Sequence, residues 1–376
     1  MRILLINHEY PPVGGGGGVA SKKLAEEYVK QGHTVDCVTS VFKNLPQYEQ
    51  VNDVNIFRVY IFLGRRVEHA AGILSLLSFL FSAFIKIWKL CRTNKYDVID
   101  THFAVPTGPL GVCISKLKKI PMNLFIYGGD IYEPSKKFSP HKYRLLRWVV
   151  SYVLNNSNRI FSDSEDIKQR TLTYFKCRKP IEVISIAYDE FIFTGKTRAK
   201  LNLSIDKTYL VSVGRLVKRK DFGTLIKALT ALEIGNVEIL LMGDGPELEN
   251  LKNLANSLEV AHRVHFLGFV TEEEKFQFLS VSDIFILSST HEGLGIVIQE
   301  AMQVGLPIIA TNNGGQTELI EDGVNGFLVE VGDYKAIAKL VKRLLDDSAL
   351  SEYFRNVNLT KIKQYTASNI VGKILN

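Results

Sequence analysis

The chain has 376 residues, 46% of them hydrophobic, which is enough for two α/β domains of ordinary size. Its charge is uneven: residues 1–190 hold 26 Lys and Arg against 17 Asp and Glu (+9), residues 191–376 hold 20 against 22 (−2), and the sum is +7. Four widely spaced cysteines form no Cys-x-x-Cys pair, which favours a reducing cytoplasm. The sequence lacks Asp-x-Asp and any His/Cys cluster with metal-ligand spacing, so we expect no metal and no cofactor.

The first predicted strand, Ile3–Ile6, is followed by five consecutive glycines, Gly14–Gly18, and by a predicted helix at Val19–Gln31. Glycines permit positive φ angles and a close approach of backbone to phosphate. The run is not a P-loop, and it lies too far behind the strand for a good dinucleotide fingerprint. A flexible surface loop is the alternative. The candidates for a phosphate contact are the central glycines Gly15, Gly16 and Gly17.

An uncharged apolar run, Ala70–Ile85, comes next. It is shorter than the roughly 20 residues that span a bilayer and lies inside an α/β series, so we expect a docked or buried helix; an interfacial helix and a true span are the alternatives. The basic residues after it favour an anionic membrane surface over a nucleic acid, for which no motif is present. Met1 and Arg2 lead directly into the first strand without a secretory signal. The basic residues concerned are Lys86, Lys89, Arg92, Lys95, Lys116, Lys118, Lys119, Lys136 and Lys137.

Two strands of the N-terminal half end in polar residues. Asp97–His102 places His102 at the carboxyl edge of the sheet, where a lone histidine is more often structural than catalytic. Leu124–Tyr127 is followed by Gly-Gly-Asp, and Asp130 is a candidate general base.

A basic loop follows the predicted strand Tyr209–Val213, with four cations in six positions. Arg215 can hold a phosphate in a planar fork, and Lys220 adds a point charge. We expect Lys218 and Arg219 to be solvated. The loop lies at the carboxyl edge, where open α/β sheets bind ligands.

Two more strands, Glu238–Met242 and Val264–Phe269, repeat this strand-to-loop pattern. The first is followed by a turn that contains Gly243 and Asp244. One sheet edge is therefore predicted to carry cations and glycine turns, which suits a nucleotide diphosphate.

The segment 288–319 is the most informative, because it places Glu292 in a loop and Glu300 in the predicted helix Ile296–Val304. Two carboxylates, one in the loop and the other inside the helix, suit a ligand with hydroxyl groups at both ends. Three backbone amides lie at the helix N-terminus, where anionic or hydroxyl-rich ligands bind. A plain strand–loop–helix unit with a solvated Glu300 is the alternative. The three amides belong to Gly293, Leu294 and Gly295.

With these motifs the chain resembles, over nearly its whole length, the retaining GT-B glycosyltransferases of family four. Glu292 and Glu300 match the family's Glu-x7-Glu element, and Arg215 and Lys220 match its diphosphate-binding pair. The resemblance implies two Rossmann-like domains with parallel sheets that face a cleft. It also implies a retaining, metal-independent transfer from a nucleotide-sugar donor to a hydroxyl acceptor.

The resemblance implies roles for individual residues as well. Glu292 and the amides after it would hold the donor sugar, Glu300 the ribose, and the segment around Val270 would face the base. The glycine loop would close over the donor diphosphate, and His102 would lie beside the reacting sugar. The expected catalytic residues are His102, Glu292 and Asp130. The expected donor-binding residues are Gly15, Gly16, Gly17, Arg215, Lys220, Gly243, Asp244, Val270, Gly293, Leu294, Gly295 and Glu300.

The sequence departs from the family pattern at two places. Tyr127 stands where the family has His, and Ile184–Asp189 replaces Ile-Pro-Asn-Gly-Val-Asp. We expect an acceptor-binding domain at 1–193 and a donor-binding domain at 194–358, with a linker near Phe193–Lys200. A C-terminal helix, Leu359–Leu375 within 359–376, is expected to pack back on the first domain.

The favoured partner besides the donor is a lipid-linked saccharide, at the inner face of the cytoplasmic membrane. Two other classes stay open: a nucleotide-sugar 2-epimerase of the same architecture, and a non-catalytic nucleotide-sugar-binding subunit. An epimerase would turn over donor without acceptor, and a binding subunit would neither transfer nor hydrolyse the sugar.

Overall fold

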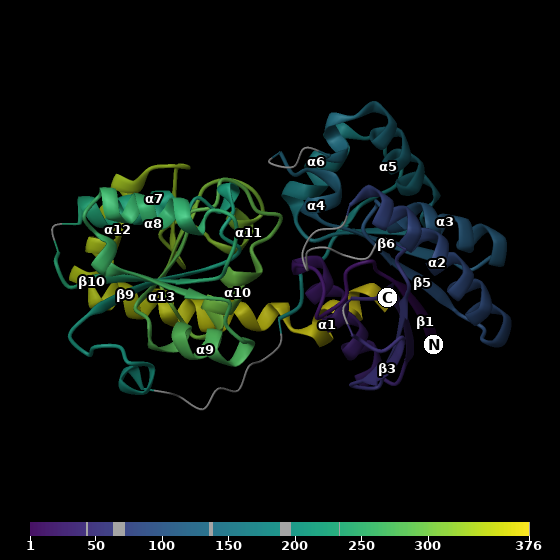
Figure 1. The fold of residues 1–376 in the computed structure, drawn as a ribbon, viewed down its shortest axis with the longest axis horizontal. Coiled ribbons are helices and arrows are strands. Elements are labelled where there is room, and N and C mark those ends of the chain that lie inside the picture. The colour runs from purple at the N-terminus through teal and green to yellow at the C-terminus, as the bar shows by residue number, and fades with distance from the viewer. Residues whose placement is uncertain (43, 63–71, 135–137, 189–196, 233, 376) are drawn as a thin grey trace. The chain divides into compact units, whose positions relative to one another are not determined.

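Eight strands from the first half of the chain form one sheet, and six strands from the second half form another. The structure, a computed structural model, describes residues 1–42, 44–62, 72–134, 138–188, 197–232 and 234–375 (Figure 1). By their internal contacts the residues form a first unit, 1–187 with 367–376, and a second unit, 188–366. Helices alternate with the strands in each unit, so the predicted fold of two doubly wound α/β domains is confirmed.

The first sheet has the order β3-β4-β2-β1-β5-β6-β7-β8, and its neighbouring strands run parallel except for the antiparallel pair β3–β4. Its inner strands are almost entirely buried, as expected for a sheet that helices cover on both faces. The strands are β1 Arg2–Ile6, β2 Thr34–Ser40, β3 Tyr48–Val51, β4 Val54–Val59, β5 Val98–His102, β6 Met122–Ile126, β7 Arg159–Ser162 and β8 Glu182–Val183.

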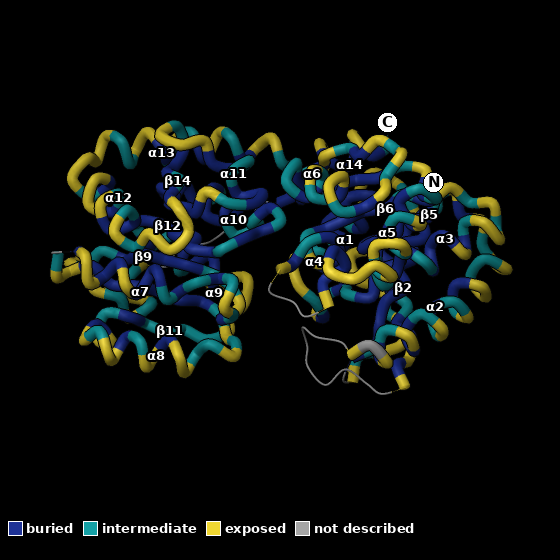
Figure 2. Tube along the Cα trace, turned by 90° about the horizontal axis from the view of Figure 1, so that it is seen from above, coloured by how far each residue is buried: buried dark blue, intermediate teal, exposed yellow. Residues whose placement is uncertain are grey.

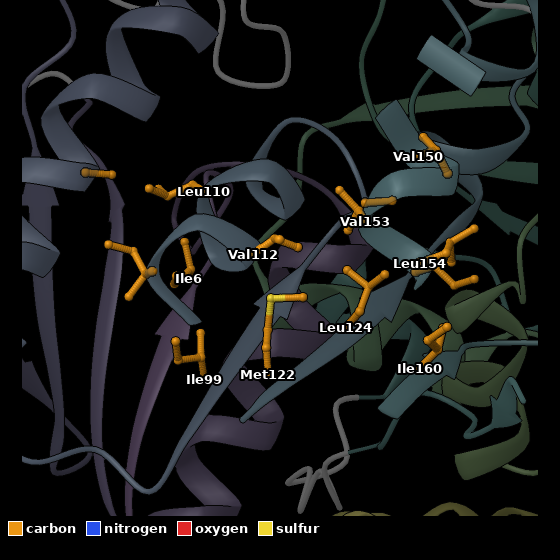
Figure 3. Close-up of a cluster of buried hydrophobic side chains, with 14 of the residues drawn as sticks. Ile6, Ile99, Leu110, Val112, Met122, Leu124, Val150, Val153, Leu154 and Ile160 are labelled. Atoms are coloured by element: carbon orange, nitrogen blue, oxygen red, sulfur yellow. The ribbon is translucent and has the colours of Figure 1, made fainter. Parts of the chain in front are cut away.

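Helices α2, α3 and α5 cover one face of this sheet and share its core (Figure 3). Helices α1 and α14 pack against each other on the opposite face. Figure 2 shows that the strands are buried and that exposed residues lie on the outer sides of the helices. The helices are α1 Gly16–Lys30, α2 Ile73–Thr93, α3 Thr107–Lys118, α4 Gly128–Ile131, α5 Arg144–Asn156, α6 Glu165–Tyr174 and α14 Ala367–Leu375, with a 3-10 turn η1 at Pro140–Lys142.

The second sheet is parallel throughout, with the order β11-β10-β9-β12-β13-β14. The carboxyl ends of its strands therefore meet at one edge. The strands are β9 Thr208–Val213, β10 Val237–Met242, β11 Val264–Gly268, β12 Ile284–Leu287, β13 Ile308–Thr311 and β14 Phe327–Val329. The helices are α7 Phe222–Ala231, α8 Leu248–Ser257, α9 Glu272–Val281, α10 Ile296–Gln303, α11 Gln316–Leu319, α12 Tyr334–Asp346 and α13 Ser348–Lys361; the 3-10 turns are η2 Arg198–Leu201, η3 Lys218–Lys220, η4 Ala261–Arg263 and η5 Ile362–Tyr365.

The predicted single helix Leu359–Leu375 is wrong, because the chain leaves the helical conformation between α13 and α14. Thr366 is extended, and the Tyr188 amide donates a hydrogen bond to the Tyr365 carbonyl at 3.0 Å. The two passages of the chain between the units thus pair with each other. The division of the units falls between Thr366 and Ala367 rather than between residues 358 and 359. The first half of the predicted linker, residues 193–196, lies outside the described residues, and its second half leads into η2.

The predicted start of the first helix at Val19 is also wrong, because α1 begins at Gly16. Three of the five glycines therefore form its first turn. Glycine is a poor helix former, so sequence propensity pointed to a loop. Packing explains the difference: a Cβ on Gly17 would lie 2.4 Å from Cζ of Phe103, so the ring leaves room only for glycine in this turn.

Docking of α14 on α1 should stabilise the first unit. Ile370 and Ile374 are buried there, so replacing either with Ala should lower the unit's free energy of unfolding by about 2–4 kcal/mol. Lys373→Ala, on the exposed side, should change it by less than about 0.5 kcal/mol. Both tryptophans, Trp88 and Trp148, belong to this unit, so their fluorescence in urea measures its unfolding. Equal stability of the three variants would contradict this role of α14.

Candidate functional site

A cluster of charged side chains lies at the carboxyl edge of the second sheet. The loop after β9 and the loop after β12 are neighbours there, because β9 and β12 are paired. The Thr290 amide donates to the Arg219 carbonyl at 2.7 Å, and the Ser288 hydroxyl donates to the Lys220 carbonyl at 3.1 Å. These bonds fix the basic loop against the loop that carries Glu292.

Glu292 is the centre of the cluster. The Lys220 ammonium lies 2.6 Å from its Oε1, and the Ser289 hydroxyl donates to the same oxygen at 2.7 Å. The Arg219 guanidinium donates to Oε2 at 2.9 Å and to the His291 carbonyl at 3.1 Å. The structure therefore brings the predicted residues Glu292 and Lys220 into direct contact.

The two cations keep Glu292 ionised. Burial alone would raise the pKa of this carboxyl, but the charges of Lys220 and Arg219 and the hydrogen bonds from Lys220 and Ser289 lower it to about 2. A carboxylate with so low a pKa is a weak base and holds no proton at neutral pH. Its chemistry is therefore that of a fixed negative charge and hydrogen-bond acceptor.

The backbone after Glu292 presents amides at the start of α10. The N–H groups of Gly293, Leu294 and Gly295 make no hydrogen bond to a described residue. The loop after β13 supports this turn: the Gly315 amide donates to the Glu292 carbonyl at 2.9 Å. A Cβ on Gly315 would lie 1.7 Å from the Gly293 carbonyl oxygen, so the two loops can approach this closely only with glycine there. The amides meet the requirements of an anion or hydroxyl site.

Four other predicted residues lie on neighbouring loops of the same edge. Arg215 is exposed directly after β9 and makes no ion pair with a described residue. Gly243 and Asp244 follow β10, and the Asp244 carbonyl accepts a hydrogen bond from the Leu216 amide at 2.9 Å. The Asp244 carboxylate accepts from the Gly245 amide at 2.7 Å, which shapes its own turn. Val270, half-buried, lies in the loop between β11 and α9.

Glu300 lies inside α10 and is buried, so the alternative of a solvated Glu300 is wrong. Its Oε1 accepts from the Lys275 ammonium of α9 at 2.7 Å. The Lys275 ammonium also lies 2.8 Å from Oε1 of Glu272. Burial would lower the pKa of Lys275, but the charges of Glu300 and Glu272 outweigh it and raise this pKa. Lys275 was missed in the sequence, because it is brought to Glu300 only by the packing of the two helices.

His102 lies at the carboxyl edge of the first sheet and is fully buried. Its Nδ1 is 2.7 Å from the Tyr127 hydroxyl, and its ring stacks on Phe125 with centroids 4.6 Å apart. Burial lowers the pKa of His102 to about 3 and raises that of Tyr127 well above its usual value. His102 is therefore a neutral imidazole at physiological pH. The departure from the family at Tyr127 thus places a hydroxyl partner beside the predicted histidine.

Asp130 is buried in α4, and its carboxylate binds backbone. One oxygen accepts from the Ala104 amide and the other from the Tyr127 amide at 2.8 Å. It therefore joins the loops after β5 and β6, a structural role that the sequence did not reveal. Its assignment as a general base stays a prediction.

The glycine loop lies at the same edge of the first unit. The Gly15 amide donates to the Glu9 carboxylate at 3.3 Å, while Gly16 and Gly17 begin α1. Phe103, next to His102, packs against Gly17 and against Tyr127, whose ring centroid is 4.9 Å away. The predicted residues Gly15–Gly17, His102 and Asp130 thus lie in adjoining segments at this edge of the first unit.

One prediction for the basic loop is wrong. Arg219 was expected to be solvated, but it donates to Glu292, whereas Lys218 is exposed as expected. The 3-10 turn η3 at Lys218–Lys220 explains the difference, because it turns neighbouring side chains to different sides of the loop. In the described residues, no group of three or more His, Cys, Asp or Glu is arranged to hold a metal.

Comparisons with known proteins agree with this arrangement. A family model described as glycosyltransferase family 4 matches residues 14–190, and one described as glycosyl transferases group 1 matches residues 193–358. An uncharacterized glycosyltransferase of Methanocaldococcus jannaschii is 29% identical over the whole chain and 97% of its own length. The lipopolysaccharide core biosynthesis glycosyltransferase LpsE of Rhizobium meliloti is 38% identical over 54% of this chain and 57% of its own.

A solved structure supports the fold. The HepE protein of Anabaena, in complex with UDP and glucose, superposes with a TM-score of 0.81 at 21% identity, over 100% of this chain and 98% of its own.

Breaking the ion pair should destabilise the second unit. Lys220→Met leaves Glu292 buried with one cation, so we expect the free energy of unfolding to fall by about 2–3 kcal/mol at pH 7. Lys218→Met, the exposed control, should have little effect. Hydrogen exchange of β9 and β12 in urea measures the change. The double variant Lys220→Met/Glu292→Met should recover part of the loss, because it leaves no unpaired buried charge. Equal effects of the two single variants would refute the pairing.

The neutral state of His102 has a pH signature. The unfolded chain protonates this histidine below a pKa of about 6.5, whereas the folded protein does so only near pH 3. Between these values the unfolded state binds more protons, so stability falls as the pH falls. His102→Asn removes this loss of stability at low pH. The difference in Tm between wild type and variant should therefore shrink from pH 7 to pH 5, as measured by tryptophan fluorescence. A difference that stays constant would contradict a depressed pKa.

Proposed function

The chain belongs to the glycosyltransferases of family 4, whose group 1 model covers its second unit, and on this premise we propose that it transfers a sugar to a lipid-linked saccharide or glycolipid. As a member of this family it is a retaining enzyme that uses a nucleotide-sugar donor. The observation that carries the proposed donor site is the contact between Glu292 and Lys220, beside three amides without a described partner.

Two cations would take the charge of the leaving diphosphate. Arg215 is exposed at the end of β9 and offers a planar fork for phosphate oxygens. Lys220 is held by Glu292 through one ammonium contact, and an ammonium group has three hydrogen-bond donors. It can therefore reach a phosphate oxygen while it keeps Glu292. The amides of Gly293–Gly295 add the positive end of α10.

Glu292 would orient the donor sugar. Its Oε1 accepts hydrogen bonds from Lys220 and Ser289, whereas its Oε2 accepts one from Arg219. A carboxylate oxygen has two lone pairs, so Oε2 retains an acceptor position for a sugar hydroxyl. Because the pKa of Glu292 is about 2, the residue acts as a positioning and electrostatic group rather than an acid–base catalyst.

Glu300 and Val270 would hold the nucleoside. Lys275 fixes Glu300 through one oxygen of its carboxylate and prevents it from remaining an unneutralised buried charge. A ribose has two adjacent hydroxyls that a carboxylate can accept together. Val270, half-buried after β11, is the apolar neighbour for the base.

The chemical task is to stabilise a departing diphosphate and an oxocarbenium-like sugar. His102, neutral at working pH, would serve as a hydrogen-bond partner beside the sugar rather than as an acid. Asp130 holds both of its neighbouring loops, so its contribution would be to keep His102 and Tyr127 in position. A front-face route, in which the leaving phosphate takes the acceptor proton, agrees with these roles.

The acceptor class is supported by likeness. LpsE, which is 38% identical over 54% of this chain, is named for lipopolysaccharide core biosynthesis, and a lipopolysaccharide is by its name a saccharide joined to a lipid. An acceptor of this kind stays with the membrane, so its enzyme has to work at a membrane surface.

Donor binding and transfer can be tested with the purified full chain. A panel of nucleoside diphosphates, beginning with UDP, is first scored by thermal shift, because a ligand that binds the folded state raises Tm. The corresponding nucleotide sugars are then incubated with lipid-linked saccharides, and labelled product is measured. Arg215→Ala and Lys220→Ala should each lower the transfer rate roughly 100-fold or more, while Lys218→Ala should keep it. EDTA should leave the rate unchanged.

Full activity of both Arg215→Ala and Lys220→Ala would refute the donor site. Turnover of donor to an epimer without acceptor would refute transfer. Binding of a nucleotide sugar without transfer to any acceptor tested, lipid-linked or free, would refute the proposed activity, and transfer to free saccharides alone would refute the lipid-linked acceptor.

A further inference from the structure

The outer sides of α2, α3 and α5 expose large apolar side chains. Along α2 they follow helical spacing, and Leu74, Leu77 and Phe81 are 57–64% exposed. On α5, Leu145 and Trp148 are 71% and 66% exposed, and Figure 2 shows the exposed stretch of this helix. We call this surface the α2–α3–α5 face. Its exposed apolar residues are Leu74, Leu77, Phe81, Ile85, Trp88, Leu117, Leu145, Trp148 and Tyr152.

These helices do not need the exposed residues for their own packing. The inner side of α2 contributes Phe79, Ala83 and Ile87 to the core of the first unit. Figure 3 shows the inner residues of α3 and α5, such as Val112 and Val153, beside the strands. Helices α2 and α5 are thus apolar on two sides, whereas a surface helix of a globular protein ordinarily exposes a polar side. Exposed apolar patches of this kind mark interaction surfaces.

The charge of the face is of one sign. The sequences of α2, α3 and α5 contain no Asp or Glu, but they contain seven Lys and Arg. By contrast, α9 of the second unit has three glutamates in its first turn. The cations are Lys86, Lys89 and Arg92 on α2, Lys116 and Lys118 on α3, and Arg144 and Arg147 on α5.

The three helices form one continuous surface. The Lys118 ammonium of α3 lies 3.8 Å from the ring centroid of Trp88 on α2. The Lys116 ammonium of α3 donates to the Tyr152 hydroxyl of α5 at 3.1 Å. Aromatic rings and lysine stems therefore bridge α2 to α3 and α3 to α5. Tryptophan, tyrosine and lysine are the residues that concentrate at the boundary between lipid headgroups and acyl chains.

Helix α2 is long and apolar enough, over Leu74–Thr93, to cross a membrane by length and composition alone. Its inner side, however, is part of a core that also includes β1, β5 and β6. Spanning a bilayer would take this side out of the core and expose the sheet. A helix that keeps one side on the protein can instead lie in the plane of the interface.

We propose that the α2–α3–α5 face docks on a membrane surface that contains anionic lipids. The apolar side chains enter the headgroup region, and the exposed cations of the three helices meet the lipid phosphates. A second copy of this chain fits less well, because a symmetric dimer would bring the same cations against each other. An acidic protein partner would match the charge, but it would not require Trp and Tyr at the rim of an apolar stripe.

The face gives the first unit an orientation on the membrane. Its helices cover one side of the sheet, whereas His102 and the glycine loop lie at the carboxyl edge of the strands. Docking by the face therefore leaves this edge uncovered for an acceptor that is anchored in the same membrane. This last step rests on the proposed function; the docking itself does not.

Vesicle flotation of the full chain tests the docking. The protein should float with phosphatidylcholine vesicles in which phosphatidylglycerol replaces about a third of the lipid, and bind roughly tenfold less to pure phosphatidylcholine. Leu77→Ser/Phe81→Ser/Trp148→Ser removes apolar contacts, and Lys89→Glu/Arg92→Glu/Arg144→Glu reverses exposed charges. Each triple variant should lower the partition coefficient at least about tenfold.

Matched controls lie in the second unit. Ile205→Ser removes an isoleucine that is 77% exposed, and Lys339→Glu/Lys342→Glu reverses exposed charges of α12; both should bind vesicles like wild type. Circular dichroism shows whether the triple variants are folded. If folded triple variants bind as well as wild type, or if wild type does not bind anionic vesicles, the proposal is wrong. Loss of a dimer in the variants, with vesicle binding unchanged, would assign the face to self-association instead.

Nucleotide binding separates this proposal from the proposed function. The triple variants should keep the thermal shift with nucleoside diphosphate, because their substitutions lie in the first unit, outside the donor loops. Arg215→Ala should lose the shift and still float with anionic vesicles. Vesicle binding without any sugar transfer would support membrane docking by the α2–α3–α5 face and refute the proposed transferase activity. Sugar transfer without vesicle binding would support the transferase activity and refute the docking.

Discussion

The candidate site depends on the buried contact between Glu292 and two cations of the loop after β9. A carboxylate inside a protein is costly unless it is neutralised and hydrogen-bonded. Lys220, Arg219 and Ser289 provide both, and they come from two loops that are distant in sequence and joined by paired strands. The same contact therefore holds the loops together and presents a fixed charge, an ammonium group and helix amides at one sheet edge. In this unit, positioning of a ligand and stability of the loops have one physical cause.

Much of this edge could be predicted from sequence, because parallel strands bring their carboxyl ends together. The proximity of Glu292 and Lys220 follows from that rule once the strands are recognised. The role of Arg219 could not be predicted, since it depends on the turn at 218–220, and neither could the pairing of Glu300 with Lys275, which requires two helices to pack. The start of α1 at Gly16 and the break before α14 were missed for a similar reason. Contacts with Phe103 and with Tyr188 override local propensity there.

The chain uses basic residues in two different physical settings. At the edge of the second sheet, Lys220 is buried, its partner is a single carboxylate, and its geometry is fixed. On α2, α3 and α5 the cations are mostly exposed, and they adjoin apolar side chains instead of acids. The first setting suits recognition of one diphosphate, and the second suits a broad surface of dispersed negative charge. The net charge of +7 is therefore less informative than the absence of Asp and Glu from α2, α3 and α5.

The central claim is that Glu292 holds the sugar of the donor while the cations hold its diphosphate. Calorimetric titration of wild type and Glu292→Gln with a nucleoside diphosphate and with the corresponding nucleotide sugar tests it most directly. The account predicts that Glu292→Gln keeps most of its affinity for the nucleoside diphosphate. Its affinity for the nucleotide sugar, divided by that for the diphosphate, should be about tenfold lower than in wild type, which corresponds to the loss of one charged hydrogen bond. An unchanged ratio of the two affinities would contradict the account.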